Sequence, residues 1–509
     1  MVTTAGQQTL LTRYLSGLEG KPIDSAAAAF YATLDHLRVT TPSIATAIAN
    51  EFRDQRRNLK LIASENYSSL ATQLAMGNLF TDKYAEGYPG HRFYAGCDNV
   101  DALEAEGAQL AQDLFGAHHA YLQPHSGADA NLVAFTAILS ARVRTPMLEA
   151  IGEEDPSKAS RGDWDKIRAA YTGQRLLCLD YYSGGHLTHG YRHNISSALF
   201  DVYSYSVERD TKQIDLDKLR AQAHEVKPLI LLAGYSAYPR KLNFAKMREI
   251  AEEVGAVFMV DMAHFAGLVA GKVFKGDYDP VAHAHIVTTT THKTLRGPRG
   301  GMVLSNEEFG PWVDKGCPAF LGGPLAHVMA AKVVALREAS TPEFQTYAAK
   351  IVENAQALAA GCLDEGMQVI TDGTDNHLLL LDVNSTFGLT GRQAESALRE
   401  CGITLNRNSL PFDANGPWYT SGLRLGTPAT TTLGMGTAEM REIAAIIKQI
   451  LAATKPSKIT RGADAGSLSK ARYRTEEAAA TAARERIDAV LSGYPLYPEL
   501  DLDMILNEA

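Results

Sequence analysis

The sequence is poor in cysteine and tryptophan and contains no long apolar or basic run. Only five of its 509 residues are cysteines, and these are widely spaced without a C-x-x-C pair. That spacing excludes a small disulfide scaffold and the common cysteine-based zinc and redox motifs. We therefore expect reduced, mostly buried thiols, as in a cytoplasmic protein, and no bound metal.

The absence of long apolar and basic segments limits the possible partners. No apolar stretch approaches the roughly 18 residues that a membrane-spanning helix needs, and residues 1–18 lack the apolar core of a signal peptide. The net charge is −9 without a Lys/Arg-rich segment, so we expect neither nucleic acid nor a membrane as partner. Hydrophobic residues make up 45% and charged residues 21%, which is ordinary for a globular protein with a large core.

The clearest architectural signal lies between residues 229 and 291. Residues 229–233 and 256–260 are short apolar runs typical of buried strands, and residues 244–254 between them have helical spacing before Gly255. A strand, a helix and a strand in this order predict two parallel strands joined by a right-handed crossover. Residues 285–291 predict a further strand, so the fold class is α/β.

The rest of the chain predicts three regions. We expect an N-terminal arm and helix over residues 1–75, a large domain over 76–340, and a smaller α+β domain with an extended tail over 341–509. In the first region, helices are expected at 25–37 and from residue 42 to about 66. Residues 141–173 are charged and predict an irregular surface insertion. After residue 340 we expect helices at 342–361, 391–401 and 475–491, a strand at 375–382, and a strand at a sheet edge at 420–427.

A lysine follows four consecutive threonines, residues 288–291, and precedes a Gly/Pro/Arg turn. Because β-branched residues favour strands, Lys293 is predicted where a strand becomes a loop. Such a lysine is usually a surface residue. In parallel sheets, however, active groups gather beyond the carboxyl ends of strands, and Asp261 and His264 follow the neighbouring predicted strand. A lysine there can be neutral part of the time and bond to a carbonyl group.

Two further motifs fit the same chemistry. Ser126, Gly127 and Ala128 open an apolar helical run, and a helix N-terminus favours an anion, although such a turn alone is more often an N-cap. His186 lies in a loop rich in glycine and histidine. Pyridoxal phosphate needs a lysine for its aldehyde, a carboxylate for its ring nitrogen, an anion site for its phosphate and a flat group over its ring. These residue types in this order make that cofactor plausible.

Nine motifs carry a family resemblance. In order they are LIASEN, KYAEGYPGHRFY, PHSGADAN, GGHLTHG, VDMAH, TTTTHKTLRGPRGG, TDNH, NRNSLP and TSGLRLGTPA. Over roughly residues 42–452 the chain resembles the serine hydroxymethyltransferase family of fold-type-I pyridoxal-phosphate enzymes, lengthened by the arm, the insertion and the tail. The resemblance implies a mostly parallel seven-stranded sheet flanked by helices in the large domain. It also implies reversible transfer of the serine hydroxymethyl group to tetrahydrofolate through an aldimine and a quinonoid, with glycine as the other product.

The resemblance also assigns roles to residues. The expected catalytic residues are Lys293, which would carry the cofactor covalently, Asp261, which would pair with its ring nitrogen, His186, which would stack on the ring, and Glu86, which would move protons. Further cofactor contacts would come from Ser126, Gly127, Ala128, Ser236, His264 and His292, with Tyr84 and Gly323 supplied by a partner subunit. The substrate would contact Ser64, Tyr94, Arg424 and Glu86, and folate would contact Tyr181, Gly185, Leu187, Asn408, Gly416, Pro417 and Trp418. We expect His189 to be structural.

Two alternatives remain at this point. The chain could be a pyridoxal-phosphate aldolase that cleaves threonine-type 3-hydroxy amino acids without folate, or a non-enzymatic binding protein that kept the fold. The presence of Glu86, Asn408 and Trp418 argues against the aldolase, and the complete set of Lys293, Asp261 and Arg424 against the binding protein. If subunits share the site, the protein is a homodimer at least.

Overall fold

A seven-stranded sheet forms the centre of the computed structural model, which describes residues 9–461 and 465–507. In spatial order the strands are β4 (His119–Tyr121), β10 (Gly301–Ser305), β9 (Ile286–Thr290), β8 (Val257–Asp261), β7 (Ile230–Gly234), β5 (Arg175–Leu179) and β6 (Asp201–Tyr205). Only β10 runs antiparallel to its neighbours. The predicted mostly parallel seven-stranded sheet is therefore confirmed.

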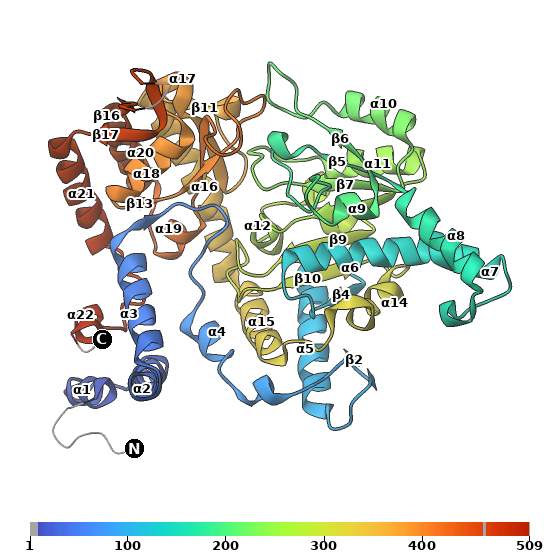
Figure 1. Ribbon diagram of the computed structural model, residues 1–509. Helices are drawn as coiled ribbons and strands as arrows, with labels where there is room; N and C mark the ends of the chain where they lie inside the picture. Colours follow the sequence, from blue (N-terminus) through green and yellow to red (C-terminus); the bar gives the residue numbers. More distant parts are fainter. Residues whose placement is uncertain (1–8, 462–464, 508–509) are drawn as a thin grey trace.

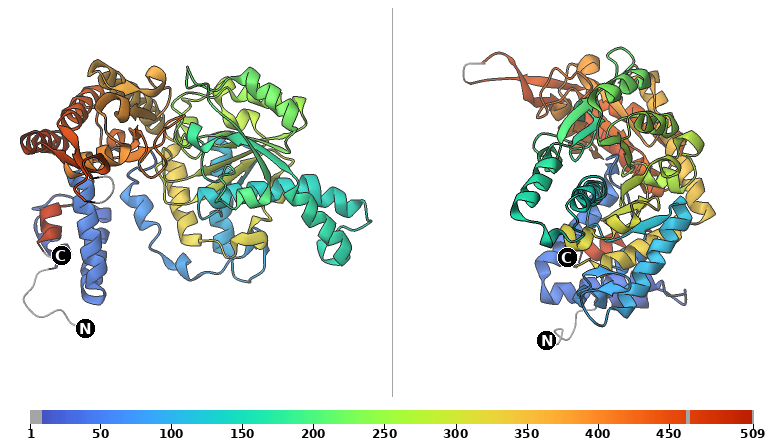
Figure 2. Two further views of the ribbon diagram at one scale, coloured as in Figure 1. Left: turned by 45° about the horizontal axis from the view of Figure 1, so that its top comes forward. Right: turned by 90° about the vertical axis from the view of Figure 1, so that its right-hand side faces the viewer.

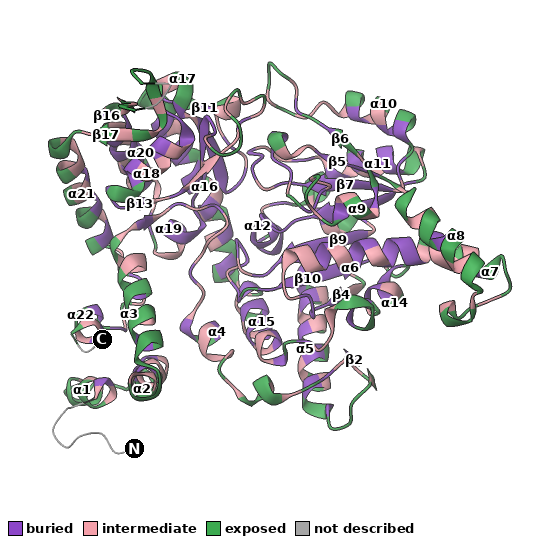
Figure 3. Cartoon of the chain, viewed as in Figure 1, coloured by how far each residue is buried: buried purple, intermediate pink, exposed green. Residues whose placement is uncertain are grey.

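Helices cover both faces of this sheet (Figure 1). Alternate side chains of a strand point to opposite faces. Thus Leu231 of β7 packs in a core with α5 (Asp98–Phe115), α11 (Phe244–Glu253) and α15 (Ala326–Ala339). Ile230 and Leu232 pack on the other side with α6 (Gly127–Leu139). Burial on both faces explains why the central strands are continuous apolar runs rather than alternating ones. Figure 3 shows the middle of the sheet as buried, whereas the edge strand β6 is mostly exposed.

The predicted strand, helix and strand are β7, α11 and β8, and the two strands are parallel. The helix ends at Glu253, and Gly255 follows with a positive φ of 70°. Asp261 is the last residue of β8, and Lys293 lies three residues beyond the end of β9. The carboxyl ends of these neighbouring strands thus bring the aspartate and the lysine to one edge of the sheet.

A second sheet lies toward the C-terminus and is entirely antiparallel. Its order is β11 (Gln368–Val369), β12 (Leu378–Asp382), β15 (Gly422–Gly426) and β14 (Asn406–Asn408). It packs in its own core with α16 (Pro342–Asp364), α18 (Gly391–Glu400) and α20 (Thr437–Ala452). The expectation of a sheet-edge strand at 420–427 was wrong, because β15 pairs on both sides and buries Leu423 and Leu425 completely.

The expected irregular insertion is mostly helical. After a π-helical turn at Ser140–Arg144, α7 (Thr145–Glu149), a 3-10 turn at Pro156–Lys158 and α8 (Arg161–Thr172) follow. The charges that suggested a loop form ion pairs one turn apart, such as Asp163 with Lys166 at 2.9 Å. Helices α7 and α8 project from the body on the side away from the small sheet (Figure 2).

The N-terminal arm is a group of helices, α1 (Leu10–Ser16), α2 (Ser25–Thr40) and α3 (Pro42–Arg57). Helix α3 was expected to continue to about residue 66, but it ends at Arg57. Asn58 is extended, and β1 (Leu59–Lys60) pairs with β13 (Ile403–Thr404) of the C-terminal part. The end of this helix is therefore set by a strand pairing with a segment over 300 residues away in the sequence.

The C-terminal tail packs against the N-terminal arm. It contains a hairpin of β16 (Thr454–Lys458) and β17 (Leu468–Thr475), then α21 (Glu477–Ser492) and α22 (Leu502–Leu506). Tyr31 and Leu34 of α2 share a core with Leu500, Leu502 and Ile505. Figure 1 shows α22 beside α1, α2 and α3. The sequence predicted only the helix at 475–491, and residues 1–8, 462–464 and 508–509 of the arm and tail lie outside the described residues.

The remaining short elements connect these parts. They are α4 (Leu70–Leu74), β2 (Gly87–Tyr88), β3 (His91–Arg92), α9 (Ser196–Leu199), α12 (Ala266–Ala270), α13 (Pro280–His283), α14 (Gly310–Val313), α17 (Val383–Phe387) and α19 (Pro428–Thr432). The longer helix α10 (Leu216–Val226) lies between β6 and β7 in the chain. All five cysteines are buried and unpaired, as expected. Within residues 9–461 and 465–507, no helix combines the length and apolar character needed to cross a membrane.

Candidate active site

A cavity of about 550 Å³ lies between the carboxyl edge of the large sheet and the small sheet. Sixteen of the predicted site residues line it: Ser64, Ser126, Gly127, Ala128, Tyr181, Gly185, His186, Leu187, Ser236, Asp261, His264, His292, Lys293, Asn408, Pro417 and Arg424. Because these residues span most of the chain, the fold rather than local sequence brings them together. The cavity also contains residues that the sequence did not single out, including Arg299 and Asn406.

Lys293 is the buried amine of this cavity, with a relative exposure of 8%. Burial lowers the pKa of Lys293 to about 8, helped by the charges of Arg424 and Arg299 and opposed by that of Asp261. Its backbone is held in place, since Asn66 Nδ2 donates to the Lys293 carbonyl oxygen at 2.9 Å. A substantial fraction of such a lysine is neutral near pH 8, which nucleophilic attack on an aldehyde requires.

Asp261 is a buried carboxylate held by three donors. Its Oδ2 accepts hydrogen bonds from Asn131 Nδ2 at 2.9 Å and His189 Nε2 at 3.0 Å, and its Oδ1 accepts one from the Ala263 amide at 3.0 Å. Burial alone would raise the pKa of Asp261. The hydrogen bond from His189, the electrostatic interaction with His189 and His186, and the hydrogen bond from Asn131 together lower that pKa. The carboxylate therefore stays ionised, as a partner for a protonated ring nitrogen must.

His189 was expected to be structural, yet it reaches the site through Asp261. Its Nδ1 accepts from the His186 amide at 3.3 Å, so Nε2 carries the proton that it donates to the carboxylate. Asn131 was missed altogether. It also donates to Thr188 Oγ1 at 2.7 Å and accepts from Thr288 Oγ1 at 2.6 Å. Both residues lie within quoted motifs, PHSGADAN and GGHLTHG, but the sequence does not show that they meet.

His186 faces the cavity as a neutral ring. Burial lowers the pKa of His186 to about 4, and its Nδ1 lies 2.7 Å from Thr188 Oγ1. The same Thr188 hydroxyl accepts from Asn131, so the ring is fixed through the network that holds Asp261. A neutral, fixed imidazole is suited to stack on a flat aromatic ligand.

The turn at the start of α6 has the features of an anion site. Ser126 is the N-cap residue, and a Cβ on Gly127 would lie 2.6 Å from Thr290 Cγ2, so only glycine fits. Among the described residues, His125 Nε2 and His292 Nδ1 are buried without a hydrogen-bond partner. Two unpaired polar atoms beside a helix N-terminus fit a phosphate group, which accepts several hydrogen bonds. Together with the lysine and the carboxylate, this turn meets the requirements of pyridoxal phosphate.

Arg424 supplies a positive charge from β15 of the small sheet. One guanidinium nitrogen donates to the Ser236 carbonyl oxygen at 2.6 Å, and Nε donates to Asn406 Oδ1 at 3.2 Å. Burial lowers the pKa of Arg424 to about 10, so it remains charged near neutral pH. No carboxylate among the described residues pairs with it, which leaves the charge available for the carboxylate of an amino acid.

The predicted residues Glu86, Tyr94, Tyr84 and Gly323 do not line the cavity of this chain. They gather in a separate cluster, in which Tyr84 Oη lies 3.5 Å from Glu86 Oε1 and the rings of Tyr84 and Tyr94 are 4.8 Å apart. A Cβ on Gly323 would lie 3.3 Å from the Tyr84 ring. The expectation that Glu86 and Tyr94 meet the substrate is therefore not met within a single chain.

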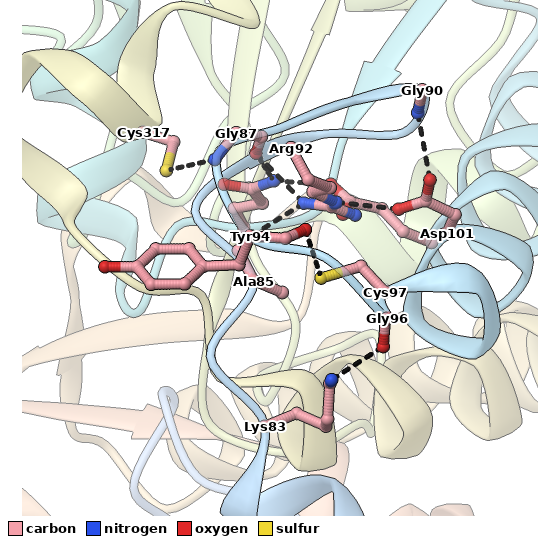
Figure 4. Close-up of polar contacts among 12 residues, drawn as sticks. Lys83, Ala85, Gly87, Gly90, Arg92, Tyr94, Gly96, Cys97, Asp101 and Cys317 are labelled. Carbon is pink, nitrogen blue, oxygen red and sulfur yellow. Dashed lines mark hydrogen bonds and ion pairs between the residues drawn. The ribbon is translucent and has the colours of Figure 1, made fainter.

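Contacts of Arg92 hold the loop that carries Glu86 and Tyr94 outside the cavity. Its guanidinium donates to the carbonyl oxygens of Ala85 and Gly87 and pairs with Asp101 of α5 at 2.7 Å (Figure 4). The Tyr94 ring points away from these contacts. The loop is thus fastened to α5 and presents its aromatic side chains outward, with Tyr94 46% exposed.

Two predicted folate residues, Gly416 and Trp418, also lie outside the cavity lining. Trp418 is 61% exposed, and the guanidinium groups of Arg392 and Arg407 lie 5.3 and 5.5 Å from its ring centroid. Pro417 lines the cavity from the same loop. This part of the loop therefore borders the cavity at Pro417 and Thr420 rather than along its whole length.

Known proteins are similar in sequence to this chain over nearly its whole length. A family model described as serine hydroxymethyltransferase matches residues 37–150 and 167–447, and the unmatched residues 151–166 fall in the projecting insertion. A serine hydroxymethyltransferase of Treponema pallidum (strain Nichols) is 57% identical over 491 residues, which cover 96% of this chain and 85% of that protein. One of Mycolicibacterium smegmatis is 56% identical over 94% of this chain and 96% of its own length.

A third relative aligns also with parts of the chain that the family model does not match. A serine hydroxymethyltransferase of Chlamydia trachomatis (serovar L2) is 49% identical over 500 residues, 98% of this chain and all of that protein. The arm and tail are thus largely shared with such relatives. Since the family match covers well over half of the residues and the relatives align over nearly all of them, the chain belongs to the serine hydroxymethyltransferase family.

Proposed function

We propose that this cavity carries out the reaction of the family, the reversible transfer of the serine hydroxymethyl group to tetrahydrofolate, which leaves glycine. The observation that carries the proposal is a buried lysine, whose pKa is lowered to about 8, beside an ionised aspartate in one cavity. The chain would thus be a pyridoxal-phosphate-dependent transferase of one-carbon and amino-acid metabolism.

In this proposal, Lys293 holds the cofactor aldehyde, Asp261 keeps a proton on the ring nitrogen and His186 covers one ring face. The turn of Ser126, Gly127 and Ala128, with His292, holds the phosphate, and Ser236 and His264 contact the hydroxyl side of the ring; all of these residues line one cavity. When bound, pyridoxal phosphate supplies an electron sink for the bond broken at the amino-acid α-carbon. The protein residues orient the cofactor and place fixed charges around it.

Arg424 and Ser64 bind the amino-acid carboxylate in this proposal. The guanidinium is held from behind by the Ser236 carbonyl and Asn406, so its remaining donors face the cavity. A planar guanidinium can hold a carboxylate by two parallel hydrogen bonds, which fixes the α-carbon relative to Lys293. Folate contacts come from Tyr181, Gly185, Leu187, Asn408 and Pro417, with Gly416 and Trp418 at the rim of the same loop.

We further propose that two chains complete each other's sites in a homodimer. Glu86, Tyr94, Tyr84 and Gly323 form a cluster outside the cavity of their own chain, and the exposed Phe93, which is 70% exposed, lies on the same loop. Apolar groups exposed in this way are typical of an interface. In the dimer, Glu86 of the partner subunit would move protons at the hydroxymethyl group.

Mixed dimers test this arrangement. A chain with Lys293→Ala and a chain with Glu86→Gln are each inactive alone, but a shared site would be intact once in each mixed dimer. We expect mixing, with brief unfolding and refolding to exchange subunits, to restore activity to as much as about half of wild type per mixed dimer. No recovery in verified mixed dimers would contradict shared sites.

Two further expectations remain proposals. The division into residues 1–75, 76–340 and 341–509 is supported by separate cores around the large sheet, the small sheet and the arm, although the tail contributes to the arm core. The cytoplasmic location is supported by five buried, unpaired cysteines.

The main experiment measures whether turnover depends on folate. Serine is converted to glycine by the purified chain with and without tetrahydrofolate, and allo-threonine and alanine serve as alternative substrates. We expect serine turnover to require tetrahydrofolate and to be lost in Lys293→Ala together with the yellow colour of the bound cofactor. Full serine turnover without tetrahydrofolate would instead support the aldolase alternative.

A further inference from the structure

Lys332 is a buried lysine to which the proposed function gives no role. It lies on α15 with a relative exposure of 2%. Its Nζ donates to the carbonyl oxygens of Leu122 at 2.5 Å, Pro124 at 3.0 Å and Gly301 at 2.8 Å. These three carbonyls belong to the segment that enters the Ser126 turn and to the start of β10.

The geometry around Nζ fits an ammonium rather than an amine. An ammonium has three donors, one for each carbonyl, whereas a neutral amine would turn its lone pair toward one of these oxygens. The charge nevertheless lacks an ion-pair partner among the described residues. Glu104 and Asp129 exert an electrostatic influence on it, but Glu104 pairs with Arg92 at 2.5 Å and Asp129 accepts a hydrogen bond from Ser126 Oγ at 3.0 Å.

Lys332 lies directly behind the proposed phosphate site. The Pro124 carbonyl accepts from both Lys332 Nζ and the Gly301 amide, the latter at 2.9 Å, so the lysine joins the two segments that form the wall of the turn. The two segments are in close contact, since a Cβ on Gly301 would lie 2.1 Å from the Ser126 carbonyl oxygen. Burial lowers the pKa values of His125 and His292, and the charge of Lys332 contributes to both shifts in the same direction.

A buried ammonium with only carbonyl partners is costly unless an anion approaches it. Burial lowers the pKa of Lys332 to about 7, against the opposing charges of Glu104 and Asp129. A phosphate group held at the Ser126 turn would supply the missing negative charge, and it would raise that pKa again.

We propose that Lys332 is a positioning residue for the cofactor phosphate: its ammonium holds the backbone of the phosphate turn from behind and provides the buried charge that a phosphate monoester dianion meets. This inference rests on the proposed function, because it takes the Ser126 turn as the phosphate site. The lysine touches neither the cofactor nor the substrate, and it acts through the turn and through its field.

The test compares pyridoxal phosphate with pyridoxal, which has the same aldehyde and ring but no phosphate. Both are titrated into the cofactor-free full chain, and binding is measured from the absorbance of the bound ligand. In Lys332→Met we expect the Kd of pyridoxal phosphate to rise about 10- to 100-fold, as for loss of a charge-assisted interaction, while the Kd of pyridoxal changes less than about threefold. Lys332→Arg should retain most of the phosphate-dependent affinity.

The controls separate this inference from the function on which it rests. Lys350→Met, on the exposed side of α16, should leave both Kd values unchanged; Lys350 pairs with Glu353 at the surface. A wild-type chain that binds neither ligand would overturn the proposed function itself. Equal weakening of both ligands in Lys332→Met, or no weakening of pyridoxal phosphate, would overturn the role of Lys332 and leave the proposed function standing.

A second measurement needs no variant, in case Lys332→Met fails to fold. Because burial lowers the pKa of Lys332 to about 7, part of the cofactor-free population lacks the ammonium proton near pH 8. Binding of the phosphate dianion should restore that proton and with it the charged form that the three carbonyls accommodate. Of the other titratable groups around this site, His125 and His292 have pKa values lowered by burial and stay neutral, and Glu104 and Asp129 are held by Arg92 and Ser126. Lys293 reacts with the aldehyde of both ligands, so its contribution is common to the two titrations. Calorimetry in buffers of different ionisation enthalpy should therefore show more proton uptake for pyridoxal phosphate than for pyridoxal, by about half to one proton. Equal proton counts would overturn the inference.

Discussion

The lowered pKa of Lys293 makes a quantitative prediction about how fast the protein captures its cofactor. Only the neutral amine attacks an aldehyde, and each pH unit below the pKa reduces the neutral fraction about tenfold. With a pKa of about 8, roughly one Lys293 in ten is neutral near pH 7. An ordinary lysine with a pKa of about 10.4 would be neutral in roughly one molecule in 2,500. At pH 7, burial should therefore raise the neutral, reactive fraction of Lys293 about 200-fold.

The assay follows the absorbance of pyridoxal phosphate after rapid mixing with the cofactor-free chain between pH 7 and 10, above the second phosphate ionisation near pH 6. We expect the association rate to rise about fivefold from pH 7 to pH 8 and to level off near pH 9. The sign is set by the lowered pKa, because the amine is half neutral at about pH 8, whereas an ordinary lysine is half neutral only above about pH 10. A rate that keeps rising through pH 10 would refute the reasoning.

Two variants test the physical cause of this shift in opposite directions. The charge of Asp261 raises the pKa of Lys293, so Asp261→Asn should move the break in the pH profile to lower pH. The charge of Arg424 lowers that pKa, so Arg424→Met should move the break to higher pH. If both variants shift the break in the same direction, the pKa is not controlled by these two charges.

Three further predictions concern single side chains. Arg424→Lys should raise the KM for serine about 10- to 100-fold in steady-state assays, because a point charge cannot bind a carboxylate with two parallel bonds; an unchanged KM would exclude this role. His189→Ala removes a hydrogen-bond donor to the buried carboxylate of Asp261 and should weaken cofactor binding, measured by titration, by ~1.5–3 kcal/mol. An unchanged Kd would show that His189 does not support Asp261. Ile505→Ala, in the core shared by arm and tail, should reduce the free energy of unfolding in urea by ~2–5 kcal/mol, and no change would mean that the tail contributes nothing to the stability of the arm.

Much of the fold could be predicted where the hydrophobic pattern is local. The strand, helix and strand of β7, α11 and β8 were correct to within about a residue because both strands are buried on two faces and therefore apolar throughout. Where charge was taken as a sign of irregular structure, the prediction failed, since α8 uses the same residues for ion pairs along a helix. The end of α3 was also wrong, because β1 pairs with a strand over 300 residues later.

The candidate site likewise contains local features that could be predicted and long-range contacts that could not. Residues that lie at strand ends or in tight turns, such as Lys293, Asp261 and Ser126, were placed correctly because their local sequence fixes where they lie on the sheet edge. His189 and Asn131 were not recognised as supports of Asp261, because a hydrogen bond across 72 or 130 residues leaves no local pattern. Glu86 and Tyr94 were assigned to the substrate, but the ion pair between Arg92 and Asp101 holds their loop outside the cavity of its own chain.

The sequence by itself therefore determined the family, the α/β class and the residue types at the carboxyl edge of the sheet, since apolar runs, turns and short motifs are local properties of a chain. Only the tertiary structure decided the charge state of Lys293 and the support of Asp261. It alone showed the buried position of Lys332 and the separation of the Glu86 cluster from the cavity. The physical reason is that burial and long-range hydrogen bonding depend on which distant segments meet, and the field at a side chain is the sum over all of them.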